Sequence, residues 1–317
     1  MADMAHQWTD RQIQALGNEI DRIYASAKQG LVARLDELLG DFDSQNREWV
    51  DAVARGETSE SDYGDWLDEV AYDSKEAGRI ASELAKEATR TNKAALAVIA
   101  SAVMGMYLES ANLSAYEFET RNGIVPDGLR PLAAGSVSIR SVLPRIPKIG
   151  PDGRKDYAWN RRKIMAVVMS AVIAGSSLPE VRARVSSIYD MDRRAVRRTA
   201  VTVATAVESV GKLDTYGTIL ASGIPVEKEW VAVMDNRTRL THRELDGQTV
   251  PIDEPFVIGS TGETIRYPGD PEASPSEVYN CRCGLDIKVA GSIKDDLRLT
   301  RLPEGLTYED WKSGKWV

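Results

Sequence analysis

The chain has 317 residues and a net charge of −8, and 43% of its residues are hydrophobic. That length and apolar fraction suffice for two or three domains with hydrophobic cores. No run of about 18 uncharged apolar residues occurs, and the N-terminus lacks the basic segment of a signal peptide. We therefore expect a protein that folds in a cytoplasm and has no membrane partner.

The charge is distributed unevenly along the chain. Residues 1–120 contain 23 acidic and 11 basic side chains, whereas residues 139–200 contain 14 basic and 5 acidic ones. An acidic region followed by a basic one indicates surfaces for two different partners.

The N-terminal part, residues 1–121, is predicted to be an acidic helical region. Apolar side chains recur at three- and four-residue spacing over residues 9–53, and Gly56 ends that pattern. Ser59 or Ser61 is expected to cap a second helix, and a third is expected from about residue 74 to 117. The third helix is apolar nearly all round in its middle, which is typical of the central helix of a bundle.

Residues 122–159 interrupt the helical pattern with prolines and turn dipeptides. We predict an irregular linker there, with short strands at most. Helical periodicity returns in a basic helical neck, residues 160–224, with expected helices at 160–174, 178–189 and 192–222. Asp192 is expected to cap the last of these helices.

From residue 225 the apolar period changes from 3.6 to 2, which indicates strands. A strand at 227–235, a hairpin about Thr261-Gly262 and a closing strand through NCRCGLDIKV predict a small α+β domain over residues 225–291. The tail, residues 292–317, is expected to form one short helix. The predicted fold class is therefore mainly α with a small, compact C-terminal α+β domain, long N-terminal helices and an irregular linker.

The most informative motifs lie in this C-terminal domain. A strand ends in D-N-R-T-R, H-R-E-L-D-G follows, and a proline-rich turn leads to N-C-R-C. The motif residues are Asp235, Arg237, His242, Asp246, Gly247, Asn280, Cys281, Arg282 and Cys283. This string resembles the Mu F-like family of phage minor head proteins, over about residues 160–290 and most strongly over 230–285.

The resemblance implies a minor capsid or head-morphogenesis protein, present in few copies and used in head assembly and in DNA packaging or ejection. It implies the portal and other capsid proteins as partners. It also implies a location inside the virion capsid near the portal vertex, after assembly in the host cytoplasm, and no small-molecule substrate. The family often carries R-T-E where this chain has Arg198-Thr199-Ala200, which argues against a required catalytic carboxylate there.

The same residues have the chemistry of a metal site. Cys281 and Cys283 would share one face of an extended strand, and with His242 they supply three zinc ligands. Asp246 or Asp235 would supply a fourth. The alternative is a packed core in which the cysteines act as small apolar side chains and His242 hydrogen-bonds the Asp246 turn. Asp246-Gly247 also suits a tight turn for geometric reasons alone.

A third interpretation is enzymatic. His242 would be a base and Cys281 a nucleophile, with Asp246 orienting the imidazole, in a metal-assisted nuclease or a transferase. Nothing around Cys281 supplies the helix N-terminus that would activate a thiol. A structural protein is therefore the main prediction.

The basic neck presents cations at helical spacing. If they face one side, they can neutralise phosphates and bind double-stranded DNA without sequence preference. The alternative is that they pair with the acidic N-terminal helices. The candidate residues are Arg161, Arg162, Lys163, Arg193, Arg194, Arg197 and Arg198.

Overall fold

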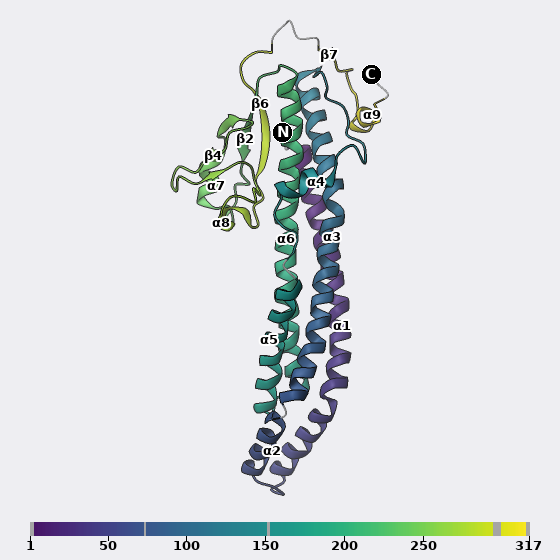
Figure 1. Cartoon of the computed structure of the whole chain (residues 1–317), viewed down its shortest axis with the longest axis vertical. Helices are drawn as coiled ribbons and strands as arrows, with labels where there is room; N and C mark the ends of the chain where they lie inside the picture. The colour runs from purple at the N-terminus through teal and green to yellow at the C-terminus, as the bar shows by residue number, and fades with distance from the viewer. Residues whose placement is uncertain (1–2, 73, 151–152, 294–298, 315–317) are drawn as a thin grey trace. The chain divides into compact units, whose positions relative to one another are not determined.

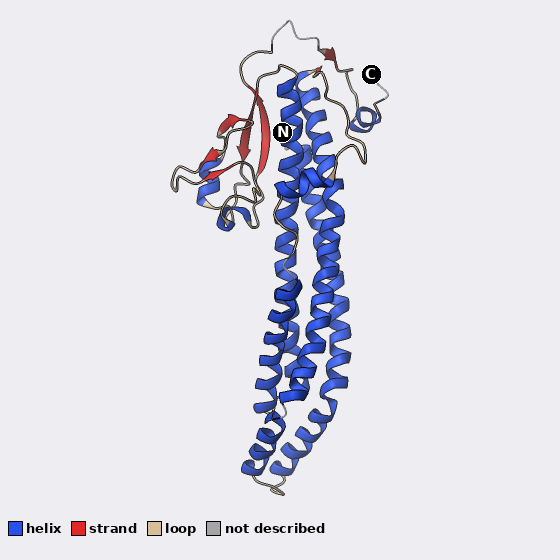
Figure 2. Cartoon of the chain, viewed as in Figure 1, coloured by secondary structure: helices blue, strands red, loops and turns tan. Residues whose placement is uncertain are grey.

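The computed structural model describes residues 3–72, 74–150, 153–293 and 299–314. About 65% of the described residues are helical, and the strands concentrate in a small C-terminal region (Figure 2). The predicted fold class, mainly α with a small strand-containing C-terminal part, is confirmed.

The chain folds into two compact units, and each is built from separate segments. The first unit contains residues 1–17, 99–149 and 198–317. The second unit contains residues 18–98 and 150–197. The proposed division into acidic region, linker, neck, C-terminal domain and tail remains a proposal about sequence segments.

Long helices supply most of the residues of the second unit and run on into the first. They are α1 (Met4–Ala54), α2 (Glu60–Tyr72), α3 (Ser74–Asn122), α5 (Gly153–Ile173) and α6 (Leu178–Ala221), labelled in Figure 1. Ser59 caps α2, because its Oγ accepts a hydrogen bond from the Asp62 backbone N–H at 3.1 Å. Gly56, at φ 70°, ends α1 as the sequence predicted.

Helix α6 is continuous, so the predicted break between residues 189 and 192 is wrong. Asp192 lies inside the helix and does not cap it. Its carboxylate instead accepts a hydrogen bond from the Asn92 amide at 3.0 Å within the second unit. Asp192, a residue type that often caps helices, therefore hydrogen-bonds to another helix here.

The linker is shorter than predicted, because α5 begins at Gly153. Residues 153–159 are therefore helical, which corrects the end of the irregular segment. Before them lie β1 (Ile124–Val125), the short helix α4 (Ile139–Val142) and a 3₁₀ turn. Asn112 of α3 holds the linker in the first unit, since its side chain exchanges two hydrogen bonds with the Leu132 backbone at 2.7 and 3.0 Å.

The first unit places α6 against α3 at very close range. A Cβ at Gly211 would lie 2.8 Å from the Tyr107 carbonyl oxygen, a distance that real side chains do not adopt. Glycine is thus required there for the two backbones to approach. Val203, Val207 and Val210 of α6 are fully buried in the same core.

A three-stranded antiparallel sheet of order β3-β2-β6 forms the centre of the C-terminal region. Its strands are β2 (Val226–Val231), β3 (Thr249–Pro251) and β6 (Gly284–Val289). Along β2, Val226, Lys228 and Trp230 are buried and alternate with less buried neighbours, as expected for one covered sheet face. The Lys228 ammonium donates to the Arg266 carbonyl at 2.9 Å, and burial lowers its pKa to about 8.

The remaining short elements surround this sheet. They are α7 (Leu240–Leu245), the hairpin of β4 (Phe256–Val257) and β5 (Thr264–Ile265), and α8 (Pro275–Val278). Strand β7 (Thr300–Arg301) pairs with β1, and α9 (Tyr308–Ser313) is the short helix expected in the tail. The hairpin about Thr261-Gly262 has the predicted position, with Gly262 at φ 72°.

One segment of α3, Ala77–Asn122, is long and apolar enough to cross a membrane, with a mean hydropathy of 1.6 in its most apolar window. It was not predicted from the sequence, because Ser101 and Gly105 interrupt its longest apolar run. Core helices of soluble proteins meet the same test of length and composition. Ile99, Val103 and Met106 of this helix are buried in the first unit.

Candidate metal centre

Asp235 organises the start of the site. Its carboxylate accepts hydrogen bonds from the Arg237 backbone N–H at 2.9 Å and from the Thr238 hydroxyl at 3.2 Å, which fixes the turn before α7. The Arg282 guanidinium donates two further hydrogen bonds of 2.8 Å to the same carboxylate. These hydrogen bonds, with that from Arg282 the strongest, hold the Asp235 pKa well below its usual range. The pair therefore joins the D-N-R-T-R turn to the N-C-R-C segment.

The two cysteines lie just before β6, which begins at Gly284, so the predicted strand through both of them is wrong. Asn280 adopts the left-handed conformation at φ 58°, and its backbone N–H donates to Thr202 of α6 at 3.1 Å. The Thr205 hydroxyl donates to the Cys281 carbonyl at 2.8 Å. These contacts with α6 fix the backbone around the two cysteines. Although this backbone is not a strand, both thiols point toward His242, as a strand would also have placed them on one face.

His242 of α7 meets these thiols in the interior. Its Nδ1 lies 3.5 Å from Cys281 Sγ and 3.4 Å from Cys283 Sγ. All three ligand atoms lie within 4.8 Å of one another, and the three residues are between 1% and 3% exposed. A hydrogen bond between the thiols raises the pKa of Cys281 and lowers that of Cys283. This buried group can hold a metal ion.

The other ring nitrogen of His242 faces Glu277 of α8. Its Nε2 lies 3.1 Å from Glu277 Oε2, although no described group accepts from Nε2 with hydrogen-bond geometry. The Thr241 hydroxyl donates to that carboxylate oxygen at 2.7 Å. A carboxylate behind a histidine favours the proton on the nitrogen facing it, which leaves the other nitrogen free to bind a metal. This role of Glu277 was not predicted, and the only sequence signal for it is an acidic residue four positions before Cys281.

Asp246, the predicted fourth ligand, does not join His242 and the two cysteines. Its Oδ1 accepts a hydrogen bond from the Ala232 backbone N–H at 2.8 Å. Asp246 and Gly247, with Gly247 at φ 77°, are the central residues of a turn closed by a bond of 2.9 Å from the Gln248 N–H to the Leu245 carbonyl. Asp246 is not in the described group of mutually close ligand atoms.

Residues 162–286 match the protein family described as phage Mu protein F like protein. The chain contains a Mu F-like domain. Its extent agrees with the resemblance drawn over about residues 160–290, and it includes His242, Glu277 and both cysteines.

Three relatives match this chain. It is 28% identical over 179 residues to the minor head protein GP7 of Bacillus phage SPP1, covering 54% of this chain and 55% of that protein. It is 31% identical over 131 residues to the uncharacterized protein YqbB of Bacillus subtilis, covering 39% of this chain and 42% of that one. It is 31% identical over 149 residues to the NAD(+)--arginine ADP-ribosyltransferase EFV of Enterococcus faecalis, covering 45% and 30%. The chain thus spans about a third to a half of these relatives, and no solved structure matches it.

The predicted basic patch divides into paired and exposed residues. In the second unit, Arg193 lies 2.9 Å from Asp21 of α1, and Arg197 pairs with the same carboxylate. Arg194 is exposed. Pairing with the acidic N-terminal helix, the alternative to DNA contact, therefore occurs for these two arginines.

The other cations of the patch are exposed. Arg161 donates to the Ser82 hydroxyl at 2.9 Å, and Lys163 lies over the Trp159 ring at 5.7 Å from its centre. Arg162 is exposed as well. Arg198, in the first unit, stacks over Tyr279 of the Mu F-like domain at 6.0 Å. Among the described residues, two of the seven predicted cations, Arg193 and Arg197, pair with acidic side chains.

Proposed function

We propose that this chain is a minor head protein of a bacteriophage, with a structural and not an enzymatic role. One observation carries the proposal. The match to the minor head protein GP7 covers 179 residues, whereas the Mu F-like domain itself covers only residues 162–286. The match to the ADP-ribosyltransferase is shorter, at 149 residues, and covers 30% of that protein against 55% of GP7.

The role we propose is that of a component present in few copies inside the capsid near the portal vertex. It would bind the portal protein and other capsid proteins and assist head assembly and DNA packaging or ejection. The exposed cations Arg162, Lys163 and Arg194 would contact DNA through phosphates, without reading sequence. Binding of this kind weakens steeply as salt increases.

We further propose that the metal held by the His242 group is zinc. Bond lengths of about 2.3 Å to sulfur and about 2.0 Å to nitrogen in a tetrahedral site place those atoms about 3.5 Å apart. The observed distances from His242 Nδ1 to the two sulfurs are 3.5 and 3.4 Å. Zinc would join α7 to the segment before β6 and so stabilise the region around the three-stranded sheet.

The second candidate is an enzyme, and the relative named as an ADP-ribosyltransferase is the observation in its favour. That match covers only 30% of the relative. His242 and Cys281 are each 1% exposed, so a substrate cannot reach them without a rearrangement of the surrounding fold. Burial therefore favours a structural use of this group over a nuclease or transferase.

The test is co-purification of the full chain with the portal protein of its phage, in low and in high salt. Association that survives high salt supports docking through packed helices, and association lost in salt assigns it to the charged surfaces. Absence of association, together with modification of nucleic acid or protein by the purified chain, would replace this proposal with the enzymatic one.

His242→Ala and Cys281→Ser separate the two functions further. In the structural account both variants lose zinc, measured by elemental analysis, and lose stability and incorporation into heads together. In the enzymatic account they fold, enter the head and lose only activity.

A further inference from the structure

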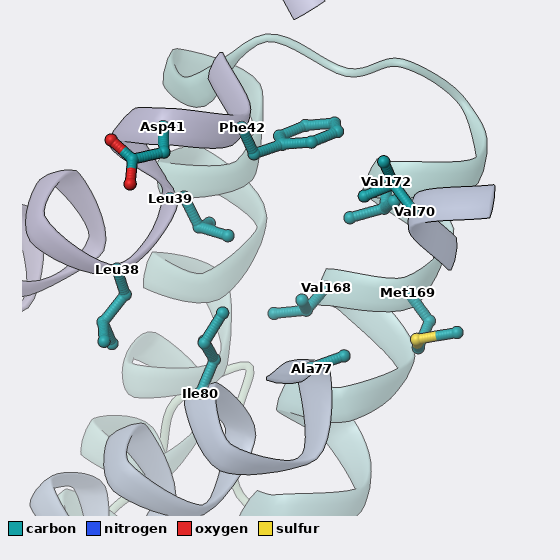
Figure 3. A pocket seen from close by; sticks show the side chains of 10 residues that line it. All are labelled: Leu38, Leu39, Asp41, Phe42, Val70, Ala77, Ile80, Val168, Met169 and Val172. Atoms are coloured by element: carbon teal, nitrogen blue, oxygen red, sulfur yellow. The ribbon is translucent and has the colours of Figure 1, made fainter. Parts of the chain in front are cut away.

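The second unit contains an apolar cavity of about 340 Å³ between four helices. Leu38, Leu39 and Phe42 come from α1, Val70 from α2, and Ile80 and Ala77 from α3, while Val168, Met169 and Val172 come from α5. Figure 3 shows these side chains arranged around one space, with the Asp41 carboxylate at its edge. A cavity of this size accommodates large apolar side chains of a partner.

A cluster of half-buried aromatic rings continues from the cavity. Trp66 of α2 stacks on Phe42 at 5.8 Å between ring centres and on Trp49 at 5.9 Å. Tyr63 stacks on Trp66 at 6.1 Å, and its hydroxyl donates to the Asn46 side chain at 2.8 Å. Partly exposed, pre-ordered Trp and Tyr side chains are typical of the residues that dominate binding at protein interfaces.

The charge around these rings is predominantly negative. Residues 36–72 contain 12 acidic and 2 basic side chains. Eight of the acids are exposed and form no ion pair with another described residue: Asp41, Glu48, Asp51, Glu60, Asp62, Asp65, Asp68 and Glu69. Such a rim repels DNA and anionic lipid and attracts a cationic partner.

We propose that this surface, made of the cavity, the four rings and the acidic rim, is the docking site for a basic amphipathic helix of a partner protein. Apolar side chains of the helix at i, i+3, i+4 and i+7 would enter the cavity, and its flanking lysines and arginines would meet the rim. Arginine also stacks favourably on exposed tryptophan. The inference rests on the proposed function only in taking the partner to be another protein of the head.

The test uses the full chain and a fluorescent synthetic helix of about 18 residues with leucines at that spacing and lysines and arginines elsewhere. Two comparison peptides are a scrambled version of equal charge and one with glutamates in place of the cations. We expect the basic amphipathic helix to bind at least about tenfold more tightly than either. A photoreactive group on its apolar face should cross-link to residues 38–42, 66–70 and 168–172.

Two variants assign the binding to the two parts of the surface. Met169→Glu places a charge in the cavity, and circular dichroism verifies that it remains helical. Asp41→Asn/Asp65→Asn/Glu69→Gln removes rim charge, and the matched control Asp253→Asn/Glu254→Gln/Glu304→Gln removes equal charge from exposed positions of the first unit. The rim variant and Met169→Glu should each weaken binding about tenfold, and the control should not.

Equal binding of the scrambled peptide, or equal losses in the rim variant and its control, would overturn the proposal in favour of general charge attraction. Self-association of the chain that Met169→Glu abolishes would also overturn it and assign the surface to a second copy. If the chain enters heads but the peptide fails these tests, only this inference fails. If the chain is absent from heads, the proposed function fails, whatever the peptide does.

Discussion

Lys212 of α6 is the most consequential buried charge of the first unit. Its ammonium lies 2.7 Å from Glu208 Oε1, with the two side chains 1% and 2% exposed. It also donates to the Leu285 carbonyl at 2.9 Å and pairs with Asp3 near the start of the chain. This one group therefore connects α6, β6 and the beginning of α1.

Lys212→Met keeps the length of the side chain and removes the charge. Among the described residues it leaves the buried Glu208 carboxylate with His6, at 3.1 Å, as its remaining ion-pair partner, and it leaves the Leu285 carbonyl without this donor. Removing one partner from a buried ion pair costs about 3–5 kcal/mol, and we expect a loss of that size in the free energy of unfolding. The measurement is urea denaturation followed by far-ultraviolet circular dichroism, with the slope against urea compared between variants.

Lys288→Met is the matched control, because Lys288 pairs with Glu229 at 3.0 Å while 47% of its side chain is exposed. An exposed pair contributes about 0–1 kcal/mol, so the control should change little. The double variant Lys212→Met/Glu208→Leu should recover part of the loss, since it removes the isolated carboxylate as well. A loss below about 1 kcal/mol for Lys212→Met, equal to that of the control, would refute the view that this network is buried in solution.

Three further predictions concern the same unit. Burial raises the pKa of Glu119 to about 7, even though Trp311 donates a hydrogen bond to its carboxylate. Folding therefore buries a charged group at pH 8 and a neutral one at pH 4. Glu119→Gln should raise the free energy of unfolding by about 1–3 kcal/mol at pH 8 and by little at pH 4, as measured by urea denaturation. Gly211→Ala should destabilise the first unit by about 1–3 kcal/mol and lower the midpoint of thermal unfolding by several degrees, because the added Cβ would overlap the α3 backbone. An unchanged midpoint would contradict the close packing of α6 on α3. Burial lowers the pKa of His6, but the opposing effect of Glu208 is larger, and the net result is a pKa of about 9. The protonated His6 therefore contributes its full stabilisation below pH 6.5, and this contribution disappears as the pH rises through 9. A His6→Gln variant should lack this pH-dependent step in the free energy of unfolding.

Much of the fold follows from apolar periodicity, because long stretches of one period leave few alternatives. The end of α1 at Gly56 and the hairpin at Gly262 also follow, since both need positive φ. The helix break predicted before Asp192 was wrong because aspartate, a common N-cap residue, also accepts hydrogen bonds from neighbouring helices. Its partner here, Asn92, lies 100 residues away in the sequence and is brought to Asp192 by the fold. The helical start at Gly153 was hidden by the adjacent turn-forming residues.

The candidate site was predicted in part. The spacing of Cys281 and Cys283 and the scarcity of histidine identified three residues that the fold brings together. The two thiols are oriented in a different way from the one predicted, because contacts with α6, and not a regular strand, place them. Glu277 was not predicted, since its place behind His242 depends on how α8 packs on α7.

The most direct test of the central claim is quantitative mass spectrometry of purified, DNA-filled phage particles produced by cells that carry the gene for this chain. The structural account predicts that the chain is present in a fixed, small number of copies per particle. It also predicts that the chain resists protease added outside the capsid and becomes digestible once the heads are opened. A chain abundant in infected cells but absent from the purified particles would contradict the account.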